Sequence, residues 1–210
     1  MSQMLTSQRP VSGHTARRLE TRRKLLEAGM ELFADRGTGA VTSTAIARHA
    51  GVATGTFYLH FDDKHALFDV LVDEALDEIR AQFSDHLAPR SGADRRREID
   101  GMVAVVERRR DLVRAVFDRG ENSGYAERIH DQIADRLEPA YEQVFRGRGL
   151  ALHAGAAAQA RAAVLVRVIA WWAEDPTRAT RTEIVDLLLE LDPLRLAGAL
   201  EPADTHSPST

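Results

Sequence analysis

Hydroxyl and small residues gather in the stretch TSTAIARHAGVATGTFYLHF, which occupies residues 42–61. Thr54, Gly55 and Thr56 open its second half, and Tyr58 follows within one helical turn. Hydroxyl and phenol groups form hydrogen bonds with phosphates and base edges, and glycine lets a backbone come close to a ligand. The stretch contains no acidic residue that would repel a polyanion. These residues therefore favour contact with the major groove of duplex DNA.

Residue types used in catalysis are present, but their spacing does not indicate an enzyme. The chain has eight histidines and 32 acidic residues. It nevertheless contains no HExxH, no glycine-rich phosphate loop, no GxSxG and no pair of histidines at metal-binding spacing. His60 and His65 are five residues apart, which is too far around a helix for them to share a metal. The absence of cysteine excludes disulfides, zinc–thiolate sites and iron–sulfur clusters. We expect no catalytic activity, no metal and no cofactor.

The elements that would hold the stretch 42–61 can be derived from its own residues. Thr42 is a good N-cap for a helix in which Ile46 faces inward. Gly51 allows the chain to reverse closely, and a short helix at about 54–60 would follow. Phe57 and Phe61, four residues apart, would attach that helix to a core. The pattern predicts a helix, a tight turn and a second helix that lies across the first.

The charge distribution is uneven along the chain. Residues 1–61 contain eight Lys or Arg and four acids, whereas the remainder carries a net charge of −8. A basic N-terminal part on an acidic body suits contact with a polyanion at one end only. Arg17, Arg18, Arg22 and Arg23 could form an arm that reaches a minor groove or phosphates, or could lie on the solvated face of a helix. Charge alone leaves both interpretations open.

The whole chain has helical periodicity and is predicted to be all-α, with about nine helices. Beyond residue 61, apolar residues recur at helical spacing, and glycines and the pair Asp175-Pro176 separate the segments. Eight of these helices can be delimited, at about residues 21–36, 43–50, 54–60, 63–88, 95–118, 123–147, 154–174 and 181–199.

The most apolar stretch, near residues 162–173, is interrupted by Arg167, so we expect no membrane span. The N-terminus lacks the apolar core of a signal peptide. We therefore expect a soluble, cytoplasmic protein with no membrane partner.

Residues 21–71 resemble the TetR family of bacterial transcriptional regulators. The family pattern combines Thr, Ile-Ala and Ala-Gly-Val in one helix with Gly-Thr-aromatic-Tyr, Phe, Lys and Ala-Leu after it. This chain supplies Thr42, Ile46, Ala47, Ala50, Gly51, Val52, Gly55, Thr56, Phe57, Tyr58, Phe61, Lys64, Ala66 and Leu67. It departs from the pattern at Ala53, where many relatives have a capping Ser, and at Thr44-Ala45, where many carry a charge.

The resemblance implies a domain division. A flexible basic arm at 1–20 precedes a helix-turn-helix DNA-binding domain at 21–66, whose motif is at 42–61. A helical regulatory and dimerisation domain at 67–200 follows, and residues 201–210 form a disordered tail.

It also implies roles for individual residues in binding DNA. Tyr58 and Lys64 would contact phosphates, and the residues around Gly55 would approach bases. The implied DNA contacts are Ser43, Thr44, Thr54, Gly55, Thr56, Tyr58, Leu59, His60 and Lys64.

The last two long helices have apolar faces broader than one packing partner requires. In TetR-like proteins these helices pair with their symmetry mates in a four-helix bundle. A two-fold dimer would also present two recognition helices about 34–36 Å apart, one turn of B-DNA. The residues expected at the dimer interface are Leu165, Val168, Ile169, Trp172, Ile184, Leu187, Leu188 and Leu191.

Relatives bind small molecules in a cavity among the middle helices. The residues that would line such a cavity here are Met102, Val105, Phe117, Tyr125, His130, Tyr141, Phe145, Trp171 and Trp172. The alternative for each of them is that it simply packs in the core or forms local hydrogen bonds.

The function implied is that of a homodimeric repressor that binds a double-stranded DNA operator and leaves it when a small molecule binds. The helix that starts at Lys64 would connect the two sites. The alternatives are a transcriptional activator, a regulator without a ligand, or a helical adaptor that binds only protein.

Overall fold

The computed structural model describes residues 13–83, 91–118 and 123–196. Within these ranges the chain forms ten α-helices and two short 3-10 helices, with no strand, which confirms the all-α prediction. The α-helices are α1 (Gly13–Arg36), α2 (Ser43–His49), α3 (Thr54–Tyr58), α4 (Lys64–Arg80), α5 (Gly92–Arg108), α6 (Arg110–Val116), α7 (Ser123–Gly147), α8 (Ala154–Glu174), α9 (Arg181–Glu190) and α10 (Pro193–Leu196). The 3-10 helices are η1 (Thr38–Ala40) and η2 (Pro176–Arg178).

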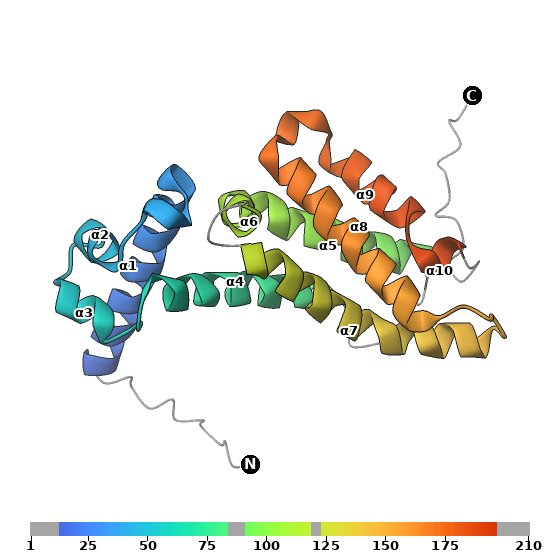
Figure 1. Ribbon diagram of the computed structural model, residues 1–210, viewed down its shortest axis with the longest axis horizontal. Helices are drawn as coiled ribbons and strands as arrows, with labels where there is room; N and C mark the ends of the chain where they lie inside the picture. The colour runs from blue at the N-terminus through green and yellow to red at the C-terminus, as the bar shows by residue number, and fades with distance from the viewer. Residues whose placement is uncertain (1–12, 84–90, 119–122, 197–210) are drawn as a thin grey trace, which may run out of the picture.

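Helices α1 to α3 form a small head at one end of the elongated molecule, and α5 to α10 form the body (Figure 1). Helix α4 leaves the head and runs along the body beneath α7 (Figure 1). The head is built around one face of α1, which buries Leu25, Leu32 and Phe33. Phe33 meets Phe68 of α4 edge-on, with ring centroids 5.2 Å apart. The head is thereby packed onto the helix that continues into the body.

The turns of the head follow from a few local interactions. Thr42 caps α2, because its hydroxyl accepts a hydrogen bond from the Ala45 N–H at 3.2 Å. Gly37 and Gly51 adopt φ values of 72° and 70°, which side chains with a Cβ disfavour. Helix α3 begins at Thr54, and the N-cap residue Ala53, which replaces the usual Ser, supplies no side-chain cap. The helix-turn-helix is therefore encoded by neighbouring residues.

Some predicted boundaries are wrong. Helix α1 begins at Gly13, so residues 13–20, assigned to a flexible arm, are helical; residues 1–12 and the tail 201–210 lie outside the described residues. The segment expected as one helix at 95–118 is divided at Arg109, whose φ of −101° and ψ of 22° leave the helical range. The last long helix ends at Glu190 rather than near residue 199, and Pro193 starts a new short helix.

Head and body share one hydrophobic core. The cluster that contains Phe33, Ile46 and Phe57 of the head continues into Val116 of α6 and Ile129 of α7. A second cluster joins α5, α8 and α9, and a third, smaller one surrounds Tyr141. The division expected at residues 66 and 67 therefore falls inside a continuous core. No helix in the described ranges is both long enough and apolar enough to span a membrane.

Candidate nucleic-acid interface and body cavity

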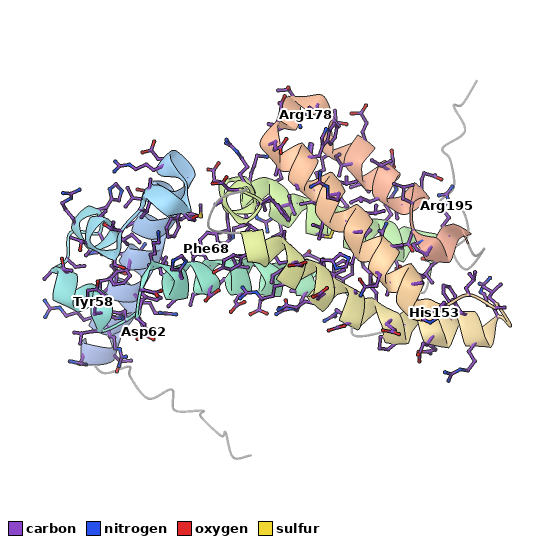
Figure 2. The ribbon with its side chains drawn as sticks, in the orientation of Figure 1. Tyr58, Asp62, Phe68, His153, Arg178 and Arg195 are labelled. Carbon is purple, nitrogen blue, oxygen red and sulfur yellow. The ribbon has the colours of Figure 1, made fainter. Side chains whose placement is uncertain are left out.

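The residues expected to contact DNA lie on α2, on α3 with the two residues after it, and at the start of α4, and all of them are exposed or half-buried. Tyr58 is 54% exposed and Leu59 is 74% exposed, although both follow the fully buried Phe57. Thr44 and Gly55 are exposed as well, and the remaining members of the set are half-buried. Figure 2 shows Tyr58 in the head, at the end of the molecule far from Arg195. Large side chains that remain exposed beside a packed core are available to a partner.

The Lys64 ammonium group, expected to contact a phosphate, also makes a contact within the head. Its Nζ donates a hydrogen bond to the Thr38 carbonyl at 2.9 Å, and the residue is half-buried. The adjoining Asp63 caps α4 by accepting hydrogen bonds from the N–H groups of His65 and Ala66 at 2.8 Å each. The bond from Ala66 is the main cause that lowers the pKa of the Asp63 carboxyl. Lys64 therefore joins η1 to the start of α4 and leaves its positive charge on this side of the head.

Two arginines of α1, Arg18 and Arg22, lie near the residues that follow α3. The Arg22 guanidinium lies 4.5 Å from the centroid of the Phe61 ring, directly after α3. Partial burial lowers the pKa of the His60 imidazole below its ordinary value of 6.5, and the charges of Arg18 and Arg22 lower it further. His60 therefore lies in a positive field that would favour phosphate.

Not every basic residue of the head is available. Arg23 pairs with Glu20 and with Glu27, so its charge is compensated within α1. Arg17 and Arg48, in contrast, have no acidic partner in the described part of the chain. Arg48 is thus an exposed residue of α2 without a compensating acid in the described ranges, and it is absent from the DNA contacts expected from the sequence.

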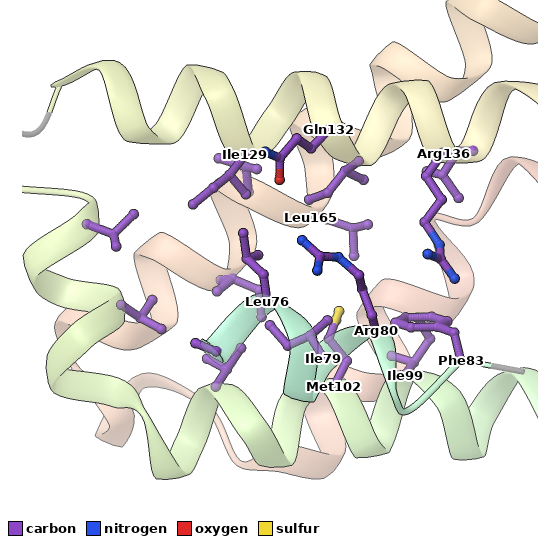
Figure 3. A pocket seen from close by; sticks show the side chains of 18 of the residues that line it. Leu76, Ile79, Arg80, Phe83, Ile99, Met102, Ile129, Gln132, Arg136 and Leu165 are labelled. Atoms are coloured by element: carbon purple, nitrogen blue, oxygen red, sulfur yellow. The ribbon is translucent and has the colours of Figure 1, made fainter. Parts of the chain in front are cut away.

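The body contains a cavity of about 240 Å³ between α4, α5, α6, α7 and α8. Its walls are mainly apolar: Leu76 and Ile79 of α4 face Ile99 of α5, and Ile129 and Leu165 close it from α7 and α8 (Figure 3). Four charged side chains also line it, namely Arg80, Arg95, Glu98 and Arg136. A mainly apolar hollow with a few polar groups is the common form of a small-molecule site.

Two of the expected ligand contacts, Met102 and Phe117, line this cavity. The others lie elsewhere for identifiable reasons. Tyr125 donates its hydroxyl to Asp69 at 2.8 Å, and Tyr141 stacks on Phe145 in the third cluster with centroids 5.6 Å apart. Burial raises the pKa of both phenols.

The remaining candidates are held in other contacts. His130 is 3.2 Å from the Gln159 carbonyl, and the Trp172 Nε1–H donates to Ala179 at 2.8 Å. Trp171 is 44% exposed on the outside of α8, and Val105 is buried outside the cavity lining. The cavity instead uses the inner stripe of α4, including Val72 and Ile79, together with Phe83 just after the helix.

The residues expected at the dimer interface fall into two groups. The first group is at most 8% exposed and packs inside the protomer, so it leaves no appreciable area for a second copy: Leu165, Ile169, Trp172, Ile184 and Leu188. The second group faces outward: Val168 is half-buried, and Leu187 and Leu191 are 42% and 41% exposed. The prediction is corrected because the inner side of each apolar face packs against α5 and the rest of the body.

No group of three or more acidic or histidine side chains in the described ranges is arranged to hold a metal ion. The head and the body cavity both offer non-covalent contacts. The head presents hydroxyl and basic groups to the outside, and the cavity is lined mainly by apolar side chains.

Comparison with known proteins gives one family. Residues 25–71 match the family described as bacterial regulatory proteins, tetR family. The chain is 35% identical over 94 residues to the HTH-type transcriptional repressor KstR2 of Rhodococcus jostii, a match that covers 45% of this chain and 43% of that protein. It is 32% identical over 119 residues to the HTH-type transcriptional regulator TtgR of Pseudomonas putida, covering 57% of this chain and 51% of the relative. The chain therefore spans about half the length of these curated relatives.

Solved structures share the fold over most of the chain. NalD of Pseudomonas aeruginosa, described as the secondary repressor of a multidrug efflux pump, superposes with a TM-score of 0.65 at 22% identity and covers 88% of this chain and 98% of its own. The SmeT–triclosan complex gives a TM-score of 0.67 at 19% identity and covers 91% and 99%.

Proposed function

Because this chain belongs to the TetR family of bacterial regulatory proteins, we propose that it is a homodimeric, sequence-specific DNA-binding repressor that a small molecule releases from its operator. The observation that carries the proposal is the outer face of α2 and α3. There Thr44, Gly55 and Tyr58 are exposed beside a fully buried Phe57, and the positive charges of Arg18 and Arg22 act on the neighbouring His60. A short rigid helix with these groups fits a major groove and its flanking phosphates.

We assign DNA binding to the head and regulation to the body. The head comprises α1 to α3, with the recognition motif at residues 42–61, and the body comprises α5 to α10. Thr54, Gly55 and Thr56 would approach the bases. Tyr58 and His60, with Ser43 and Thr44 from α2, would contact the backbone, and Leu59 would face the groove.

The dimer that we propose uses an outward apolar patch on α8 and α9. Val168, Trp171, Leu187 and Leu191 form this patch, and each is exposed or half-buried in the single chain. Exposed large apolar side chains at helical spacing are typical of a surface that another copy covers. A two-fold axis at the patch would hold two heads for successive turns of DNA.

Release by a ligand requires that DNA and ligand favour different arrangements of the same chain. Helix α4 is the element common to both sites, since Lys64 contacts η1 in the head and Leu76 and Ile79 line the cavity. A ligand that shifts the C-terminal half of α4, which lines the cavity, would change the spacing of the two heads in the dimer. A coupling of about 1–3 kcal/mol would lower operator affinity by roughly 5-fold to 150-fold.

The proposal is tested first by DNA binding. Fragments of genomic DNA are selected with the purified full chain, and affinity for the selected sequence is measured by fluorescence anisotropy at two salt concentrations. We expect specific binding that weakens with salt at a logarithmic slope of about 0.9 per phosphate contacted. Tyr58→Phe should weaken all sequences alike, whereas substitutions at Thr54 or Thr56 should change the preferred sequence. Failure to bind any fragment at low salt contradicts the proposal.

The dimer is tested by sedimentation of matched variants. Leu187→Glu puts a charge into the proposed interface and should give a folded monomer at micromolar concentration. Leu152→Glu changes a side chain that is 53% exposed outside the patch, and it should remain dimeric. A monomeric unmodified protein, or a dimeric Leu187→Glu variant, contradicts this part of the proposal.

A further inference from the structure

The charged side chains of the body cavity are not distributed evenly around it. The end of the cavity next to the head is lined by apolar residues, among them Val72, Leu112 and Val116. All four charged residues that line the cavity lie at the other end, on the C-terminal half of α4, the N-terminal half of α5 and the second half of α7: Arg80, Arg95, Glu98 and Arg136. The cavity therefore has an apolar end and a charged end.

At the charged end, positive charge is in excess. Arg95 and Glu98 are buried and pair with each other at 3.4 Å, and Arg95 is also held by Asp192 at 2.9 Å. Glu98 is the one carboxylate in the lining, and it is paired with Arg95. The lining therefore offers no second carboxylate to the guanidinium groups of Arg80 and Arg136, which are both exposed residues. Figure 3 shows Arg80 directed from α4 into the cavity and Arg136 directed from α7 toward Phe83.

The two arginines are available to an anion. Arg136 has no acidic partner among the described side chains, and Arg80 pairs with Asp77, whose side chain is 71% exposed. A pair between two exposed groups contributes little free energy, so an incoming anion displaces it at small cost. The planar guanidinium group binds carboxylates through two parallel hydrogen bonds.

The size and shape of the cavity define the rest of the ligand. From Val72 to Arg80, α4 rises roughly 12 Å at about 1.5 Å per residue. The cavity volume of about 240 Å³ lies just below the range of roughly 300–1,000 Å³ that small-molecule sites span. A narrow, apolar body of moderate length matches this length and volume.

We propose that this cavity binds an amphipathic anion: a medium-length apolar chain that ends in a carboxylate, with the carboxylate between Arg80 and Arg136 and the chain directed toward the head. This assignment deepens the proposed function and rests on it for its regulatory meaning. Val72, Val116 and Ile129, at the apolar end, also belong to the core cluster that includes Phe33 and Phe57 of the head. The end of the chain would therefore press on the core that supports the DNA-binding helices.

The charge preference is tested by calorimetric titration of the full chain with decanoate, 1-decanol and decylammonium, which share one chain length. We expect decanoate to bind at least about tenfold more tightly than decylammonium, with decanol between them. Equal binding of decanoate and decanol, tighter binding of decylammonium, or no binding of decanoate overturns the proposal.

The role of the two arginines is tested with the double variant Arg80→Met and Arg136→Met. The affinity of this variant for decanoate should fall at least about tenfold, whereas its affinity for decanol should stay unchanged. Unchanged decanol binding also shows that the cavity is intact. Arg146→Met is the matched control, because Arg146 lies on α7 outside the cavity, is 81% exposed and pairs with Glu142 at 3.8 Å. Unchanged decanoate binding in the double variant overturns the proposal.

A DNA readout separates this inference from the proposed function. Decanoate should release the selected operator, whereas butyrate, which has the same carboxylate but cannot reach Val116, should not. If decanoate binds with the expected charge preference and the operator stays bound, the ligand class stands and release by that ligand is refuted. If the chain binds no DNA, the DNA-binding function is refuted while the titrations still decide the ligand class.

Discussion

The Tyr125 hydroxyl donates a hydrogen bond of 2.8 Å to the Asp69 carboxylate and thereby joins α7 of the body to α4. Arg128 reaches the same carboxylate oxygen at 3.2 Å. The Tyr125 ring also meets Phe68 edge-on, with centroids 5.0 Å apart. This junction lies where α4 leaves the head (Figure 2 marks Phe68), so it fixes the position of the head on the body.

Tyr125→Phe should lower the free energy of unfolding by about 1 kcal/mol, because it removes one partly buried hydrogen bond and keeps the ring contact. Urea denaturation followed by circular dichroism measures the change. Tyr58→Phe is the control: Tyr58 is exposed, and its hydroxyl has no hydrogen bond within the described structure, so stability should stay unchanged. An unchanged urea midpoint for Tyr125→Phe would show that the hydroxyl contributes nothing.

A buried ionic cluster joins three helices at the far end of the body. Asp192, fully buried, accepts from Arg95 Nε at 3.0 Å and from the Leu194 N–H at 3.0 Å. Arg161 is fully buried as well; its Nη2 lies 3.6 Å from Asp192, and its Nη1 donates to Leu188 at 2.6 Å. Burial is the main cause that lowers the pKa of the Arg161 guanidinium. The cluster depends on Asp192 to balance two buried cations.

Asp192→Ala should therefore destabilise the protein by about 3–5 kcal/mol, since it leaves two guanidinium groups buried without their shared acid. Asp186→Ala is the matched control, because Asp186 pairs with Arg96 on the surface and should contribute less than about 1 kcal/mol. Both are measured by urea denaturation. Equal effects of the two substitutions would contradict the assignment of a stabilising role to the buried cluster.

The helix-turn-helix could be predicted from the sequence because its determinants are local. The Thr42 cap, the positive φ of Gly51 and the spacing of Phe57 and Phe61 each depend on residues within one or two turns. The same is true of the capping box at the start of α9, where the Thr180 hydroxyl and the Glu183 carboxylate are in contact. Such features need no knowledge of the distant chain.

The cavity and the outward patch could not be predicted at the level of residues. Helical periodicity marks an apolar face but does not say whether that face meets the protomer's own core, an empty space or another copy. Ile184 and Leu187 belong to the same predicted stripe, yet the first is buried against the body and the second is exposed. The lining of the cavity comes from five helices, so its position follows from their packing.

The two glycines of the recognition motif should respond in opposite ways to substitution by alanine. Gly51 has a φ of 70°, so Gly51→Ala should cost roughly 1–2 kcal/mol in stability although no atom lies within 4 Å of the added Cβ. Gly55 lies in α3 with open space around it, so Gly55→Ala should raise stability by up to about 1 kcal/mol.

For DNA binding we expect Gly55→Ala to be the damaging change, because its new methyl group would stand between the backbone of α3 and the bases. Thermal denaturation and anisotropy on the same preparations measure both effects. If Gly55→Ala keeps full operator affinity, α3 does not approach DNA along this face.

The DNA affinity should rise as the pH falls from about 8 to about 6, because the His60 imidazole would take up a proton when the protein binds DNA. In the free protein, partial burial, Arg18 and Arg22 hold the pKa of the imidazole below 6.5, so the ring is neutral at pH 7. Phosphates beside the ring would raise its pKa, and binding would then take up a proton. The gain in affinity appears as the pH falls through the bound pKa, and it levels off below the free pKa.

Anisotropy titrations across this range measure the effect, whose limit is a tenfold change in affinity per pH unit for each proton taken up. His60→Gln should remove the pH dependence. His153→Gln should leave it unchanged, because His153 lies at the opposite end of the molecule (Figure 2). A pH-independent affinity in the unmodified protein, or a dependence that survives in His60→Gln, would place the imidazole away from the phosphates.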